Sequence, residues 1–153
     1  MDILGKIIEG KEVTFDKKCV PLLWLSGQEI DARMNRISAK FGITSLQTII
    51  LYYLDESENG SMTINELSDC ITQKANTSRS VTQLVKMGLV TKSRSDSDER
   101  VVFVNITEKG KMLKSSTAEA LSILYSVGLN EEEAKVLYDL LIKVLTFQSV
   151  QEA

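Results

Sequence analysis

Residues 74–110 constrain the fold of this chain more than any other segment. The first part, KANTSRSVTQLVK, is polar and basic but carries apolar residues at helical spacing, which predicts an amphipathic helix. Gly88 follows as a helix stop signal. Residues 89–92 and 101–106 favour strands and flank SRSDSDER, so they predict a β-hairpin with a charged tip. Thr107 then begins another helix.

A polar, basic helix followed at once by a charged hairpin is typical of a winged helix-turn-helix unit, whose helix enters a groove of DNA. The charge distribution favours the same interpretation. Residues 74–114 carry nine basic and four acidic side chains, a net charge of +5, whereas the rest of the chain sums to −8 and the whole to −3. A basic segment on an acidic body is the electrostatic pattern of a local DNA-binding surface.

The segment before this unit predicts further helices. Pro21 suits the first turn of a long helix, Gly42 ends it, and residues 1–18 predict a short helix and a connector. Thr44 or Ser45 then caps a second helix. The long helix has one apolar stripe, formed by Leu23, Ile30, Met34, Ile37 and Phe41.

Capping residues define the remaining helices. After a loop at residues 55–61, Thr63 and Glu66 form a capping box that opens a short helix. Asn76 or Thr77 is expected to cap the polar helix. Beyond the hairpin, the apolar spacing predicts one more helix, and the sequence NEEE opens a last one.

Composition narrows the class of protein. The chain has 153 residues, of which 43% are hydrophobic and 25% charged, which fits one globular domain. No apolar run reaches the ~18 residues that span a bilayer, and the N-terminal sequence lacks a signal-peptide pattern, so we expect a cytoplasmic protein. The chain has no histidine, and the P-loop, GxGxxG and GxSxG motifs are missing, so we expect no enzyme, no metal and no cofactor.

Five sequence blocks together resemble the MarR family of bacterial transcription regulators. They follow one another without a gap, and the resemblance covers about residues 63–114. The family often carries two basic residues after the wing aspartate, whereas here the first of them is Glu99. The blocks are NTSRSV at residues 76–81, LV at 84–85, GLV at 88–90, DER at 98–100 and VNITEKG at 104–110.

The resemblance implies a mainly α fold with a small β-wing. It also implies a homodimer that binds a pseudo-palindromic operator in double-stranded DNA as a repressor. A small-molecule effector or an oxidant is then expected to release this homodimer from the DNA. The implied parts are a single domain at residues 1–153, a DNA-binding lobe at 44–108 with the helix-turn-helix at about 63–87 and the wing at 89–106, and dimerisation helices at 1–42 and 109–153.

Arg79 lies near the start of the polar helix, where an arginine can bind guanine O6 and N7 with two hydrogen bonds. It can equally contact a phosphate or form an intramolecular salt bridge. Lysines suit phosphate contacts, although each can also be a solvated charge. At the wing, Arg100 is expected to enter the minor groove and Asp98 to brace it. The predicted DNA-binding set is Lys74, Asn76, Thr77, Ser78, Arg79, Thr82, Gln83, Lys86, Lys92, Arg94 and Arg100.

Apolar residues near both ends of the chain exceed what a small winged-helix core can cover. They form the dimer interface or, alternatively, fill the monomer core: Leu22, Leu23, Trp24, Leu25, Leu140, Val144 and Phe147. A second group either lines an effector cleft between the dimer helices and the winged lobe or belongs to the core: Trp24, Met34, Tyr52 and Tyr53.

Cys19 has two interpretations. Lys17 and Lys18 beside it favour the reactive thiolate, and the resemblance makes it a candidate oxidant sensor. The alternative is a small buried apolar residue, which is also the prediction for Cys70.

The whole chain has a rival interpretation as well, a winged-helix protein-interaction module that does not bind DNA. The net charge of −3 and Glu99 favour this module, whereas the +5 segment argues against it.

Overall fold

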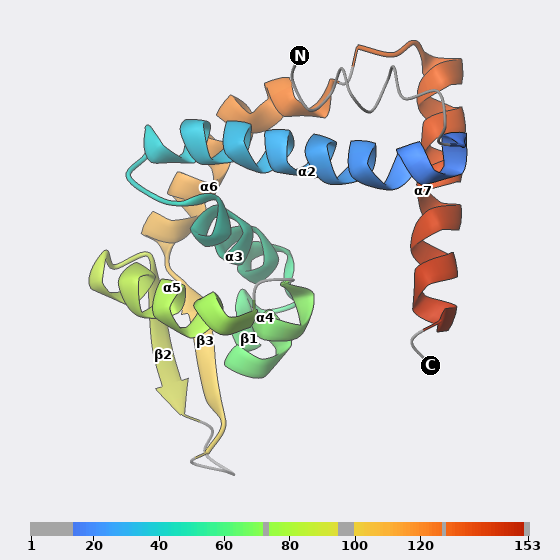
Figure 1. Cartoon of the computed structure of the whole chain (residues 1–153). Helices are drawn as coiled ribbons and strands as arrows, with labels where there is room; N and C mark the ends of the chain where they lie inside the picture. Colours follow the sequence, from blue (N-terminus) through green and yellow to red (C-terminus); the bar gives the residue numbers. More distant parts are fainter. Residues whose placement is uncertain (1–13, 72–73, 95–99, 127, 152–153) are drawn as a thin grey trace. The chain divides into compact units, whose positions relative to one another are not determined.

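The computed structural model describes residues 14–71, 74–94, 100–126 and 128–151, which fall into two compact units (Figure 1). The first unit, Met1–Leu121, contains five helices and three strands among its described residues. The predicted fold class, mainly α with a small β-wing, is confirmed. Its elements are α2 (Phe15–Ala39), α3 (Ser45–Glu56), β1 (Ser61–Thr63), α4 (Ile64–Cys70), α5 (Lys74–Lys86), β2 (Val90–Arg94), β3 (Val102–Ile106) and α6 (Glu108–Leu121).

Helix α2 begins earlier than predicted. It starts at Phe15 and runs through Pro21, so the predicted connector before residue 18 is helical where it is described. A proline inside a helix removes the hydrogen bond to the carbonyl four residues earlier, here Lys17. Lys17 is exposed, so water can satisfy that carbonyl near the start of the helix. Gly42, with φ of +74°, lies in the turn that follows α2.

Two capping boxes fix the starts of α3 and α4. The Thr44 hydroxyl accepts from the backbone N–H of Gln47 at 3.2 Å, and the Thr44 N–H donates to Gln47 Oε1 at 2.9 Å. Thr63 and Glu66 repeat this arrangement at 3.2 and 2.7 Å, as predicted. The hydrogen bond from the Thr63 backbone lowers the pKa of the Glu66 carboxyl. The two helix starts are therefore encoded locally.

The sheet contains one strand that the sequence did not predict. The strand order is β1-β3-β2, with both pairs antiparallel, and β1 aligns Met62 with Val104. The predicted loop at residues 55–61 is shorter as a result, because α3 reaches Glu56 and β1 begins at Ser61. At the base of the hairpin, Gly110 of α6 lies so close to the Leu89 carbonyl oxygen that a β-carbon would collide with it.

Helix α3 lies at the centre of the first unit. Figure 1 shows it between α2 and the pair α4 and α5, and it also contacts α6 and β3. Ile50 and Leu54 of α3 are fully buried with Leu67 of α4, Leu84 of α5 and Val104 of β3. Burying these side chains stabilises the fold by roughly 1.5–3 kcal/mol for each large one. The core thus attaches α4, α5 and the hairpin to one helix.

The second unit, Ser122–Ala153, contains the 3-10 helix η1 (Ser122–Tyr125) and α7 (Glu131–Gln151) among its described residues. Asn130 and Glu133 form the predicted capping box, with both hydrogen bonds at 3.0 Å. Within the described part of the chain, no helix combines the length and the apolar character that crossing a bilayer requires.

Candidate nucleic-acid interface

Helix α5 has one buried and one exposed face. The buried face is formed by Thr77, Ser80, Val81 and Leu84, at helical spacing. Burial of this face leaves the opposite face in solvent. Most of the predicted DNA-binding residues of α5 are exposed there: Asn76, Ser78, Arg79, Thr82, Gln83 and Lys86. The side chain of Lys74 lies outside the described residues. The sequence has no acidic residue between positions 74 and 94, so the exposed face of α5 carries no carboxylate, and apart from Val85 its described exposed side chains are polar or basic.

Two side chains of this face already have partners inside the protein. The Thr82 hydroxyl donates to the Ser78 carbonyl at 2.9 Å, within α5. Gln83 Oε1 accepts a hydrogen bond from Gln47 Nε2 of α3 at 2.9 Å. The sequence did not point to Gln47, because a contact across 36 positions leaves no local pattern.

Thr77 differs from its expected place. Helix α5 begins at Lys74, so Thr77 is not its N-cap, and its side chain is 0% exposed. It belongs to the buried face with Val81, one turn later, and not to the exposed face that holds the other polar residues. Among the described residues, Thr77 Oγ1 has no hydrogen-bond partner.

The hairpin adds further positive charge. Lys92 and Arg94 are exposed and, two positions apart on β2, share one face of the strand. Arg100 is exposed just before β3. Asp98 and Glu99 lie outside the described residues, so the predicted brace at Asp98 stays a prediction.

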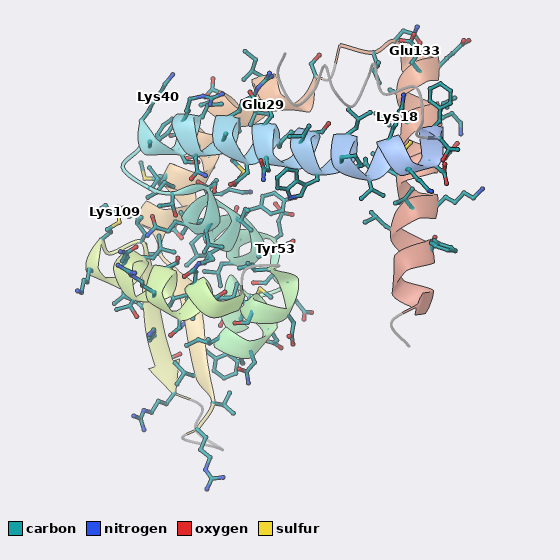
Figure 2. The ribbon with its side chains drawn as sticks, viewed as in Figure 1. Lys18, Glu29, Lys40, Tyr53, Lys109 and Glu133 are labelled. Carbon is teal, nitrogen blue, oxygen red and sulfur yellow. The ribbon has the colours of Figure 1, made fainter. Side chains whose placement is uncertain are left out.

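Other charges of the basic segment are engaged within the fold. Lys114 of α6 contacts Asp55 of α3 at 2.8 Å, and this hydrogen bond is the main reason that the Lys114 pKa is raised. Lys109 donates to the Met87 carbonyl at 2.8 Å, just past the end of α5 (Figure 2). A cation there also complements the helix dipole. Lys114 therefore joins α6 to α3, and Lys109 joins α6 to the end of α5, whereas Arg79 and Lys86 are exposed on α5.

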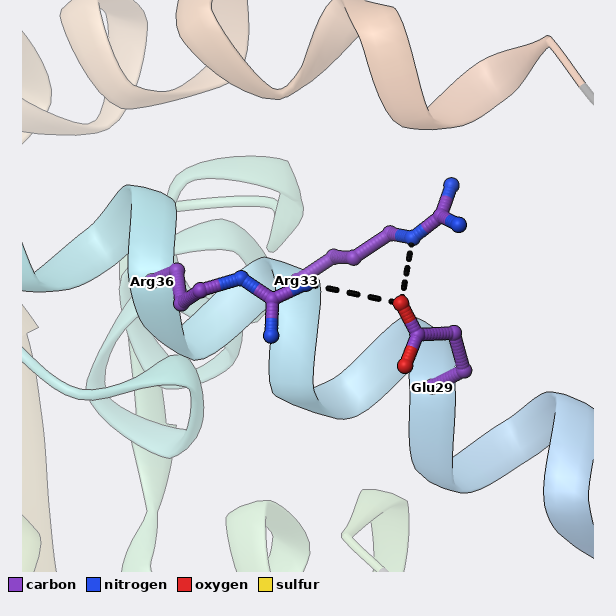
Figure 3. A network of polar contacts seen from close by, with 3 residues as sticks. All are labelled: Glu29, Arg33 and Arg36. Carbon is purple, nitrogen blue, oxygen red and sulfur yellow. Dashed lines mark hydrogen bonds and ion pairs between the residues drawn. The ribbon is translucent and has the colours of Figure 1, made fainter. Parts of the chain in front are cut away.

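A separate charged cluster lies on α2 (Figure 3). Glu29 Oε1 accepts from Arg33 Nε at 2.8 Å and from an Arg36 guanidinium nitrogen at 3.4 Å. The Arg33 hydrogen bond is the largest cause of the lowered Glu29 pKa. All three side chains are more than half exposed, and such ion pairs contribute little to stability.

Both cysteines are exposed. The prediction that Cys70 is buried is wrong, because Cys70 is the last residue of α4 and lies beyond its buried Leu67. The buried alternative for Cys19 is wrong as well.

The apolar residues predicted for a dimer interface or a core are largely uncovered in their own units. Trp24 is 61% exposed and Phe147 63% exposed. Leu23 and Leu140 are also exposed, whereas Leu22, Leu25 and Val144 are half-buried.

The four residues of the predicted effector cleft differ in exposure. Met34 and Tyr53 are half-buried, and Tyr52 is exposed with Lys114 over its ring. A hollow of about 400 Å³ lies elsewhere in the first unit, and none of the four predicted cleft residues lines it. Its lining is Phe41, Met87, Leu89, Lys109, Met112, Leu113 and Ser116.

Known proteins resemble this chain in sequence and in fold. The family model of the transcriptional regulator SarA/Rot matches residues 33–117, more than half of the chain. The chain belongs to the SarA/Rot family of transcriptional regulators. The predicted DNA-binding regulator is thereby confirmed at the level of the family, and proteins of this family are regulators rather than enzymes.

Individual relatives agree with this membership. The organic hydroperoxide resistance transcriptional regulator of Bacillus subtilis (strain 168) is 27% identical over 120 residues, which cover 78% of this chain and 79% of the relative.

Among solved structures, a MarR variant from E. coli in complex with operator DNA has a TM-score of 0.74 and 23% identity, covering 95% of this chain and 99% of that one. BpsR of Bordetella bronchiseptica, whose DNA binding is regulated by 6-hydroxynicotinic acid, has a TM-score of 0.71 and 22% identity, covering 83% and 98%. The fold is that of the MarR family regulators, as the sequence predicted.

Thr77→Val distinguishes a buried role for Thr77 from a DNA contact. Because an unpaired buried polar group costs ~1–3 kcal/mol, we expect the variant to raise the free energy of unfolding by about 1 kcal/mol. We expect its affinity for DNA to be unchanged. Urea denaturation and gel-shift titration measure the two quantities, with Thr82→Val on the exposed face as the control that gains no stability. A stable Thr77→Val protein with weakened DNA binding would return Thr77 to the DNA-binding set.

Proposed function

We propose that this SarA/Rot family protein binds double-stranded operator DNA with α5 in the major groove. The observation that carries the proposal is the exposed face of α5, which is polar and basic and has no carboxylate. The 13 residues of α5 make a helix about 20 Å long, and the major groove of about 12 Å admits a single helix. The E. coli MarR variant, a protein of the same fold, is known in complex with operator DNA, which supports binding to an operator.

Individual roles follow from the chemistry of the side chains. Arg79 is the candidate for bidentate hydrogen bonds to guanine, because its planar guanidinium matches O6 and N7. Lys86 and Lys92 supply charge to phosphates. At the wing, Arg100 enters the minor groove, where the negative potential attracts arginine.

We further propose that the protein acts as a homodimer on a pseudo-palindromic operator. One copy of α5 presents few base-reading side chains, and two copies would read half-sites about 34–36 Å apart. The exposed apolar side chains of α2 and α7, such as Trp24 and Phe147, are suited to an interface with a second copy because water would otherwise solvate them.

Regulation by a ligand or an oxidant is part of the same proposal. BpsR responds to 6-hydroxynicotinic acid, and the Bacillus subtilis relative is a hydroperoxide resistance regulator. By analogy, we propose a repressor that an effector releases from its operator. Cys19 is the candidate oxidant sensor, because its thiol is exposed and follows Lys17 and Lys18 in the sequence.

Arg79→Ala and Lys86→Ala separate base reading from phosphate contact. For operator DNA selected from genomic fragments, Arg79→Ala should weaken binding about tenfold or more and relax the preference at one position per half-site. Lys86→Ala should weaken all sequences equally and lower the slope of log affinity against log salt by about 1. Arg33→Ala, which removes an exposed arginine of α2, is the matched control and should leave both unchanged.

Two outcomes contradict the assignment. An Arg79→Ala affinity within about twofold of the wild type would mean that α5 does not read bases through Arg79. Wild-type protein that shows no salt-dependent binding to bulk DNA would favour the protein-interaction module instead.

Phe147→Glu tests the dimer. We expect wild-type protein to sediment as a dimer and Phe147→Glu to sediment as a monomer, because a carboxylate in an apolar interface is not solvated. Thr146→Glu, at an exposed neutral position that helical spacing puts on another face of α7, adds the same single charge and should remain dimeric. A wild-type monomer at the concentrations that bind DNA would contradict the proposal.

A further inference from the structure

Gln47 connects the start of α3 to the exposed face of α5. Its side-chain oxygen accepts the backbone N–H of Thr44 at 2.9 Å, and its side-chain nitrogen donates to Gln83 Oε1 at 2.9 Å. A backbone N–H can only donate, so the end of the Gln47 amide that faces Thr44 must be the oxygen. The other end is then the amino group, and the atom of Gln83 that receives its hydrogen bond must be the Gln83 oxygen.

We propose that Gln47 is a positioning residue that determines which end of the Gln83 amide faces DNA, so that Gln83 presents its amino group and reads a base-edge acceptor. The proposal rests on the proposed function, in which α5 lies in the major groove. It deepens that function by assigning the chemistry that one exposed residue of α5 recognises.

The arrangement is held in place by burial. Gln47 is 3% exposed, so turning its amide over would leave buried polar groups without partners. The first turn of α3 is itself attached to α2, because the Ser45 N–H donates to Asn35 Oδ1 at 3.0 Å and the Ser45 hydroxyl donates to Asp31 Oδ1 at 2.9 Å. Gln47 is therefore a fixed donor against which Gln83 orients.

Gln83 itself is placed to reach a base. It is exposed, lies one helical turn after Arg79 and three positions before Lys86, and so shares their side of α5. A glutamine that is free to turn reads adenine with two hydrogen bonds, because its oxygen accepts from N6 and its nitrogen donates to N7. Here the oxygen is engaged by Gln47, and the amino group is the end left for DNA.

The chemistry of base edges then gives a preference. In the major groove, guanine O6 and N7, adenine N7 and thymine O4 are acceptors, whereas cytosine offers only an amino donor. Gln83 held in this way disfavours cytosine at the position it contacts and can donate to any of the other three bases.

Gln47→Glu reverses the orientation with little change in shape. The new carboxylate still accepts the Thr44 N–H, since glutamate is a usual third residue of a capping box. It cannot donate to Gln83, so the Gln83 amide turns its amino group to the carboxylate and its oxygen to the DNA. In selection from random-sequence duplex DNA, one position per half-site should then change from disfavouring cytosine to favouring cytosine or adenine over guanine and thymine, by about tenfold.

Three variants complete the experiment. Gln83→Ala identifies the position by abolishing preference there alone. Gln28→Glu, an exposed glutamine on α2, controls for the added charge and should leave every preference unchanged. Gln47→Met removes the donor without adding charge and frees Gln83 to read adenine, so it gives a second test if Gln47→Glu does not fold, which thermal melting reports.

The outcomes distinguish a failure of the role of Gln47 from a failure of DNA binding by α5. If Gln83→Ala alters one position but Gln47→Glu and Gln47→Met keep the wild-type profile there, or if Gln83→Ala alters none, Gln47 does not orient a base-reading Gln83. The role of α5 still stands in those cases, provided that Arg79→Ala relaxes its own position. If the wild-type protein enriches no sequence at all, the proposed function fails and this inference fails with it.

Discussion

The structure depends on the packing of one face of α5 against α3. Val81 and Leu84 are fully buried on that face, so the helix can rotate about its axis only by exposing them. Fully burying such side chains is worth roughly 1.5–3 kcal/mol each, which is a large fraction of the stability of a small domain. The identity of the outward-facing residues therefore follows from the hydrophobic core, and the presentation of Arg79 and Lys86 is a consequence of folding.

Acidic and basic side chains are unevenly distributed along the chain. The chain as a whole is acidic, yet residues 74–94 contain no carboxylate. Lys114, in contrast, is paired with Asp55 and Glu56, where it joins α6 to α3. A count of basic residues along the sequence merges these two kinds of lysine. The structure separates them: Lys114 joins two helices, whereas Arg79 and Lys86 are exposed on α5.

Local signals in the sequence predicted the helices well, and contacts between distant residues account for most of what it did not predict. The Thr63–Glu66 and Asn130–Glu133 capping boxes lie within single turns, so three positions of sequence suffice to encode them. Strand β1 is three residues long and exists through its pairing with β3, 40 to 44 positions away, which no periodicity reveals. The helical Pro21 shows that one missing hydrogen bond near an exposed helix start is tolerated.

In the candidate DNA-binding surface, too, local signals were predicted from the sequence and contacts between distant residues were not. Helical spacing identified the exposed polar residues of α5, but it placed Thr77 among them because a threonine can serve either face. The sequence could not predict the link from Gln47 to Gln83, because α3 and α5 meet only in the folded protein. The DNA contacts and the dimer interface stay predictions.

Methylation interference on a selected operator tests the central claim, that α5 enters the major groove, most directly. Dimethyl sulfate methylates guanine N7 in the major groove and adenine N3 in the minor groove. The account predicts that the wild-type protein fails to bind operators methylated at guanine N7 within each half-site. Binding that tolerates methylation at every guanine N7 and is blocked only at adenine N3 would contradict it.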